Sequence, residues 1–243
     1  MGFKLYLNVP YDEKEEAKRL GAWWDAKVKK WFIPFYKEEF KDYQPFFRWI
    51  LGDSTFVVVP NEDIYIMETY RTCWSCGKKT KVIAFSVGRY ATLEVDEEIL
   101  LDDYWEEYVG RENPYLVMFP EKEEDIPLCI KNYVKEHYHV ENRYSKTLER
   151  EQFANYCEYC NALQGNHHLF QEALSPFGPD NNDKIRIVSI VIDECTIALK
   201  WNVFFEMYHK DYSEKFIYAD IDLGINEACD NLYNMIIHER HFI

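Results

Sequence analysis

Four of the seven cysteines in this chain form two Cys-x-x-Cys pairs, a spacing at which one tight turn presents two thiolates. The pairs are Cys73 with Cys76 and Cys157 with Cys160. Together they offer the four soft ligands that a tetrahedral zinc ion takes in structural sites. Because four thiolates leave no position open for water, we expect one structural, non-catalytic zinc ion per chain.

The spacing between the two pairs is unusual. Eighty residues separate Cys76 from Cys157, whereas a compact zinc ribbon has roughly 15–20. Loop-closure entropy grows only with the logarithm of length, so an inserted subdomain is compatible with a shared site. Gly77 and Asn161, which follow the pairs, suit the positive φ of such turns. The alternative is that each pair is separately structural or redox active.

The remaining cysteines and two histidines are weaker candidates. His167 and His168 follow the second pair and could replace a cysteine ligand, but a surface position or one beside the site is simpler. The odd cysteine count argues against a disulfide framework. The other three cysteines lie in apolar stretches and are expected to be small buried side chains: Cys129, Cys195 and Cys229.

Charge divides the chain into two unlike parts. Residues 1–50 hold 10 Lys and Arg against 8 Asp and Glu, and the remaining 193 hold 18 against 35. Because nucleic-acid affinity depends on cationic side chains, only the N-terminal part is a candidate contact. Its candidate residues are aromatic and basic: Trp23, Trp24, Lys27, Lys29, Lys30 and Trp31. The alternatives are a solvated lysine turn and a tryptophan core.

An acidic stretch at 94–107 contains eight carboxylates and no Lys or Arg, interrupted by apolar residues. It is either a solvated amphipathic face or an interaction face that imitates nucleic acid. Its acidic residues are Glu94, Asp96, Glu97, Glu98, Asp102, Asp103, Glu106 and Glu107.

Local patterns predict the elements that must position these residues. At the N-terminus they predict a strand at 3–9, a helix beginning at Asp12 and ending at Gly21, a strand at 29–33 and short helices around Pro45. Strands are predicted on both sides of each cysteine pair. Further along, alternation or apolar runs predict strands at 55–60, 63–70, 80–87, 115–119 and 184–192, and helical spacing appears at 126–139 and 225–238.

The N-terminal motifs resemble a small bacterial module of unknown function. The resemblance rests on Leu-Gly-Ala-x-Trp-Asp at 20–25 and Lys-x-Trp-Phe-x-Pro at 29–34, and it extends over about residues 3–50. That module is found in plasmid primases of the TraC type and in other mobile-element proteins, which implies a nucleic-acid context. The two cysteine motifs also look like a region of uncharacterised bacterial proteins.

The fold class we predict is α+β. We expect a βαβ-like N-terminal module (1–52), a body with a split four-cysteine zinc ribbon (53–175, with an insertion at about 88–150) and a C-terminal α/β segment (176–243). The apolar runs are far shorter than the roughly 18 residues of a membrane helix, so no membrane partner is expected. The N-terminus lacks a secretory pattern, which predicts a cytoplasmic protein.

Three functions follow from these features. The favoured one is a non-catalytic zinc protein that binds or recruits, with nucleic acid contacted through the N-terminal module. The second is an acidic protein that binds a protein partner as an antirestriction-like DNA mimic. The third is a metal-dependent nuclease whose carboxylates are Asp193, Glu194, Asp220 and Asp222. Common nucleotide-binding, hydrolase and metalloprotease motifs do not occur in the sequence, so enzymatic activity is not expected.

Overall fold

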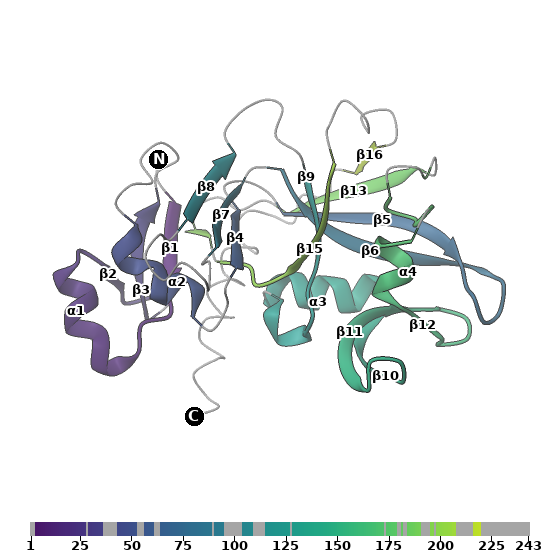
Figure 1. Cartoon of the computed structure of the whole chain (residues 1–243), viewed down its shortest axis with the longest axis horizontal. Helices are drawn as coiled ribbons and strands as arrows, with labels where there is room; N and C mark the ends of the chain where they lie inside the picture. Colours follow the sequence, from purple (N-terminus) through teal and green to yellow (C-terminus); the bar gives the residue numbers. More distant parts are fainter. Residues whose placement is uncertain are drawn as a thin grey trace.

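The computed structural model describes residues 3–27, 29–35, 43–52, 56–60, 64–88, 90–94, 104–108, 115–126, 128–172, 174–178, 181, 184–190, 195–196, 198–207 and 216–219. Strands and short helices both occur there, which confirms the α+β prediction. Of the helices in these stretches, none is long and apolar enough to cross a membrane. The N-terminal elements lie at one end of the longest axis, and the turn between β5 and β6 lies at the other (Figure 1).

The N-terminal sheet has the strand order β14-β1-β3-β2. Its strands are β1 (Phe3–Leu7), β2 (Trp23–Asp25), β3 (Lys30–Phe35) and β14 (Cys195–Thr196). Because β1 and β2 are both antiparallel to β3, which lies between them, they run parallel to each other. The predicted βαβ-like unit is therefore present in a split form. Its helices are η1 (Tyr11–Glu13), α1 (Lys14–Arg19), η3 (Gln44–Phe46) and α2 (Phe47–Leu51).

The first helical segment ends as predicted but begins differently. No side chain caps its start, although Asp12 and Glu15 have capping-box spacing. A 3-10 turn comes first, and the Glu13 carboxylate at the start of α1 instead accepts a 2.6 Å hydrogen bond from Trp49 Nε1. At the other end Gly21 has φ of 101°, the left-handed conformation that glycine adopts without steric cost.

The body is built on a six-stranded sheet of order β15-β9-β6-β5-β13-β16. The strands are β5 (Ile64–Thr72), β6 (Lys79–Val87), β9 (Tyr115–Phe119), β13 (Ile185–Ile190), β15 (Asn202–Met207) and β16 (Phe216–Ala219). β5 and β6 pair along their full length, which projects the turn between them away from the sheet. The first cysteine pair lies in this turn.

Two smaller sheets complete the body. One contains β4 (Phe56–Pro60), β7 (Tyr90–Glu94) and β8 (Tyr104–Tyr108). The other contains β10 (Val140–Ser145), β11 (Arg150–Tyr156) and β12 (Leu163–Gln164), and its last two strands flank the second cysteine pair. The helices of the body are η4 (Glu123–Asp125), α3 (Leu128–His137) and α4 (Asn166–Phe170).

Two hydrophobic cores meet at β4. Val57 and Val59 pack into the core of the N-terminal module, whereas Val58 between them packs into the main core. All three side chains are fully buried. Alternate residues of a strand point to opposite faces, so this one strand serves both cores. The division into units 1–52, 53–175 and 176–243 stays a prediction.

The strands predicted at 55–60, 63–70, 80–87, 115–119 and 184–192 are confirmed as β4, β5, β6, β9 and β13. The helical spacing at 126–139 corresponds to α3. The helix predicted at 225–238 falls outside the described residues.

Candidate metal centre and aromatic sheet face

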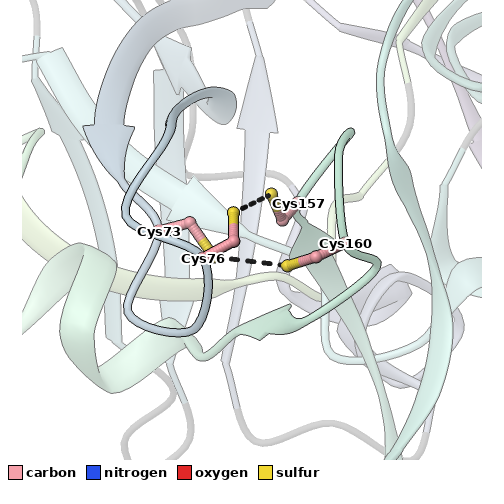
Figure 2. Close-up of side chains that lie close together, drawn as sticks. All are labelled: Cys73, Cys76, Cys157 and Cys160. Atoms are coloured by element: carbon pink, nitrogen blue, oxygen red, sulfur yellow. Dashed lines mark hydrogen bonds between the residues drawn. The ribbon is translucent and has the colours of Figure 1, made fainter.

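The four predicted cysteines come together at the end of the β5–β6 hairpin (Figure 2). Their Sγ atoms all lie within 4.8 Å of one another. The Sγ atoms of Cys73 and Cys160 are 3.7 Å apart, as are those of Cys76 and Cys157. Sulfurs placed about 2.3 Å from one central ion in a tetrahedron are separated by about 3.8 Å. The cluster can therefore hold a tetrahedral metal ion.

The two cysteine turns have the same backbone hydrogen bonds. In the first, the Ser75 N–H points at Cys73 Sγ at 3.4 Å, and the Gly77 N–H donates to the Cys73 carbonyl. In the second, the Tyr159 N–H points at Cys157 Sγ at 3.4 Å, with an equivalent bond from Asn161. The residues after the pairs have φ of 71° and 57°, as their types predict. Each turn thus delivers its sulfurs on a fixed backbone.

Buried polar side chains tie the second turn to β6 across the long sequence gap. The Asn155 side chain accepts from the N–H of Ile83 and donates to its carbonyl, at 2.8 and 3.0 Å. These bonds pair the backbone of Ile83 in place of a neighbouring strand, because β9 pairs only with Phe85–Val87 of β6. The Glu158 N–H donates to Thr80 Oγ1. The 80-residue separation is therefore closed by specific hydrogen bonds.

Two further side chains act on the sulfur of Cys73. The fully buried Gln164 donates from Nε2 to Cys73 Sγ at 3.3 Å. Burial lowers the pKa of Arg71, while the nearby Glu172 and Cys73 act to raise it, so a cation stands beside the cluster. A donor and a cation both favour thiolate over thiol. Neither residue was a sequence candidate, because neither carries a motif.

The surroundings of the thiols shift the pKa values of Cys73 and Cys76 in opposite directions. Burial would raise the pKa of Cys73, but N–H groups of Cys76 and Ser75 and the thiols of Cys160 and Cys157 outweigh it and lower the pKa to about 6. The pKa of Cys76 is raised to about 11, although the Lys78 N–H acts to lower it, because burial and the neighbouring sulfurs disfavour a further charge. The cluster therefore favours one thiolate but disfavours a further thiolate beside it. A bound cation would offset the repulsion between the negative sulfurs and favour further ionisation.

His167 and His168 do not join the cluster. Both are exposed on α4, where their Nδ1 atoms contact the carboxamide of Gln171 and the carboxylate of Glu172. The surface position predicted for these two histidines is therefore confirmed. Of the other cysteines, Cys129 lies in α3 and Cys195 in β14, with side chains that are not described, and Cys229 lies outside the described residues.

The structure separates the tryptophans of the predicted aromatic and basic face. Trp24 pairs with Trp31, and both lie on the sheet face that carries the buried Leu5 and Leu7. Trp23 pairs with Phe32 on the opposite face. Trp23 is 64% exposed and Trp24 is 45% exposed. The two exposed indoles therefore cannot form one continuous stacking platform.

The face that carries Trp23 combines aromatic rings with lysines. The rings of Trp23 and Phe32 are 6.4 Å apart, and Lys4 Nζ lies 5.1 Å from the Phe32 ring centroid. Lys30 contacts Asn8 Oδ1 on the same side, and the exposed Lys27 and Lys29 lie in the turn between β2 and β3. We call this surface the outer sheet face, defined by Lys4, Trp23, Lys27, Lys29, Lys30 and Phe32. Sequence reasoning missed Lys4 and Phe32, although alternation within each strand puts them on the face opposite their apolar neighbours Leu5 and Ile33.

The Asp25 carboxylate links β1 to the turn between β2 and β3 through hydrogen bonds. It accepts hydrogen bonds from Lys4 Nζ at 2.9 Å, Tyr6 OH at 3.1 Å and the Lys27 N–H at 3.0 Å. Burial would raise the pKa of Asp25, but these three donors outweigh it and hold the pKa below its ordinary value. The Asp25 carboxylate is therefore ionised and largely neutralised by Lys4.

The other predicted sites are not described in side-chain detail. Glu94 lies in β7 and Glu106 and Glu107 lie in β8, where only the backbone is described. The remaining acidic candidates lie outside the described residues: Asp96, Glu97, Glu98, Asp102 and Asp103. The same holds for the candidate nuclease carboxylates Asp193, Glu194, Asp220 and Asp222.

Comparison with known proteins identifies the N-terminal region. Residues 4–50 match a family described as a domain of unknown function, DUF5710. The chain is 46% identical over 57 residues to a DNA primase TraC of Escherichia coli, and 40% identical over 55 residues to a second. These alignments cover 24% and 23% of this chain but only 4% and 5% of the primases. No solved structure matches the chain. The predicted TraC-type N-terminal module is therefore confirmed.

Proposed function

We propose that this protein is a non-catalytic zinc protein that binds nucleic acid through the outer sheet face of its N-terminal module. The cysteine cluster supports the zinc part, because four convergent thiolates match the ligand set of a closed structural site. Zinc would join the β5–β6 hairpin to the β11–β12 turn and so fix two distant parts of the chain.

Metal analysis tests the zinc part. Protein purified without added metal is expected to contain one zinc ion per chain. Replacing Cys73 or Cys157 with serine should remove the metal and destabilise the body, since both sulfurs are fully buried ligands. Cys229→Ser is the matched control and should keep its zinc. Wild-type protein without bound metal would contradict the proposal.

The nucleic-acid part rests on one observation above others: Trp23 is 64% exposed beside Phe32, on a face bordered by lysines. Bases stack on such rings without sequence preference, and lysines bind the phosphates between them. The similarity of this module to a segment of two DNA primases supports the same context. The negative charge of the rest of the chain limits contact to such local basic surfaces.

Fluorescence anisotropy with the full chain tests this part. A labelled single strand of about 12 nucleotides should bind at about 50 mM salt and dissociate towards 200 mM. Trp23→Ala should weaken binding about tenfold by removing a stacking platform. Tyr11→Ala is the matched control, because Tyr11 is 82% exposed but lies outside the outer sheet face. Equal affinities for Trp23→Ala and wild type would reject this face.

A further inference from the structure

The turn between β5 and β6 lies at the opposite end of the molecule from β1, β2 and β3 (Figure 1). Aromatic and basic side chains at this turn form a second surface. We call it the knuckle surface, defined by Tyr70, Lys78, Lys79, Lys81 and Tyr159. Tyr70 lies directly opposite Lys81 in the β5–β6 hairpin, and Lys79 lies two residues before Lys81 on the same sheet face. Tyr159 comes from the second cysteine turn. The surface therefore forms only when the two turns meet.

The aromatic rings of this surface are open to solvent. Tyr70 is 49% exposed and Tyr159 is 55% exposed. Lys78 Nζ lies 4.7 Å from the centroid of the Tyr159 ring. The Glu158 N–H donates to Thr80 Oγ1 at 3.2 Å, which places the turn that carries Tyr159 beside the part of β6 that pairs with Tyr70.

The charge of this surface is opposite to that of the whole chain. Its neighbourhood includes Arg186, which shares the buried Glu68 carboxylate with Lys81, at 2.9 and 3.4 Å. Lys78 and Lys79 are exposed, and Glu158 lies next to Tyr159 in the second cysteine turn. The three lysines of the knuckle surface therefore gather positive charge in a chain whose formal charge is −15. Such a local excess favours a polyanion.

The surface is also rigid. The Tyr159 N–H is held against Cys157 Sγ, and the Cys73 N–H donates to the Lys78 carbonyl at 2.8 Å. Backbone bonds of the cysteine turns thus fix the residues that carry the ring and the lysine. A preorganised surface loses less conformational entropy on binding.

We propose that the knuckle surface is a second contact site for single-stranded nucleic acid, with bases stacked on Tyr70 and Tyr159 and phosphates bound by Lys78 and Lys79. The two exposed rings and their lysines provide both parts of this recognition. The site is independent of the outer sheet face, so either can be rejected while the other stands.

Binding of the full chain to a labelled single strand of about 12 nucleotides tests the proposal. The variants are the double substitution Tyr70→Ala with Tyr159→Ala, and the double substitution Lys78→Gln with Lys79→Gln. Each is made in wild type and in Trp23→Ala. The matched controls are Tyr144→Ala, because Tyr144 is a 60% exposed tyrosine on β10, and Lys146→Gln in an exposed turn. Metal content is measured in every variant, and Tyr159→Phe serves as a second variant that keeps the ring.

In Trp23→Ala, where the knuckle surface is the proposed remaining site, we expect the tyrosine pair to weaken binding about tenfold and the lysine pair to reduce the salt dependence. In wild type the tyrosine pair should lower the number of strands bound per chain. Tyr159→Phe should bind as wild type does, because stacking needs only the ring. Unchanged affinity of both double variants would overturn the proposal, even if Trp23→Ala weakens binding. Competition by polyglutamate as strong as that by the oligonucleotide would also overturn it, because charge alone would then explain binding.

Discussion

Gln164 shows how much of the candidate metal centre lies outside its cysteine motifs. Its side chain is fully buried, and Nε2 donates both to Cys73 Sγ and to the Ala162 carbonyl. A donor held in this way stabilises the thiolate and fixes the direction of the sulfur lone pairs. Residues around a metal that orient its ligands are worth roughly 10–100-fold in metal affinity.

We therefore expect Gln164→Glu to weaken zinc binding by roughly 10–100-fold, because a carboxylate replaces the donor next to a thiolate. Competition with a chromophoric chelator measures the change. Gln171→Glu, at the exposed residue that follows α4, adds the same charge where the side chain contacts His167 and not a cysteine, and should leave affinity unchanged. Equal zinc affinities for the two variants would show that Gln164 has no role in holding the sulfur.

Gly77 provides a second test at the residue scale. It has φ of 71°, and a Cβ built there would meet no atom within 4 Å. Gly77→Ala should therefore lower the free energy of unfolding by about 1–2 kcal/mol through backbone strain alone. Gly165→Ala is the matched control, because its φ of −59° suits alanine and its Cβ would make only ordinary contact. Urea denaturation of the zinc-loaded proteins measures both, and equal losses would refute the strain argument.

The four cysteines of the candidate site were predictable from the sequence, but the residues that support them were not. Two Cys-x-x-Cys pairs constrain a turn locally, so Gly77 and Asn161 could be assigned from residue type alone. Gln164, Asn155 and Arg71 act across the fold, and no local pattern marks an amide or a guanidinium that will lie beside a sulfur or a strand edge. Their roles depend on pairings between residues far apart in sequence.

At the scale of elements, the short β2–β3 hairpin decides which side chains share a surface. Neighbouring residues in a strand point to opposite faces, so Trp23 and Trp24 are separated although they are adjacent in sequence. No strand was predicted at residues 23–25, so the predicted aromatic and basic face did not take this alternation into account. Pro34 lies inside β3, although proline has no N–H to donate to a neighbouring strand. The position is compatible with a strand because β2 pairs only with Lys30–Phe32, so at Pro34 no described strand pairs with that edge of β3.

Asp25 makes the stability of this hairpin depend on pH. Because its pKa is lower in the folded protein, its stabilising effect is fully present above the unfolded value of about 3.9 and is lost as pH falls through the folded value. At pH 7 we expect Asp25→Asn to lower the free energy of unfolding by about 1–2 kcal/mol. The difference from wild type should shrink as the pH falls below about 4.

Urea unfolding followed by tryptophan fluorescence at several pH values measures this difference. Asp12→Asn is the matched control, since the exposed Asp12 caps no helix. A loss for Asp25→Asn that is the same at neutral and acidic pH would contradict a role for the ionised carboxylate.

At the scale of the whole molecule, β4 connects the two hydrophobic cores. Val57→Ala and Val59→Ala should destabilise the N-terminal module, and Val58→Ala should destabilise the body, each by roughly 1–3 kcal/mol. Hydrogen exchange separates the two effects, because amides of β1 report on the first core and amides of β6 on the second. Identical exchange patterns for the three variants would show that the cores unfold as one unit.

The overall arrangement was only partly predictable. Strand positions and the α+β class follow from apolar alternation, which is a local property. The pairing of β1 with β14, about 190 residues apart, and the order of the six-stranded sheet depend on long-range contacts that the periodicity of one segment does not contain.

The family match ends at residue 50, before β4 begins at Phe56. The limit of the family match and the limit of the hydrophobic core therefore do not coincide, since Val57 and Val59 lie beyond the match. A protein in which the module ends at the limit of the family match has to cover the same apolar surface with a segment of its own. We expect the host chain, and not the transferred segment, to set how firmly the module is anchored and in which direction its outer sheet face points.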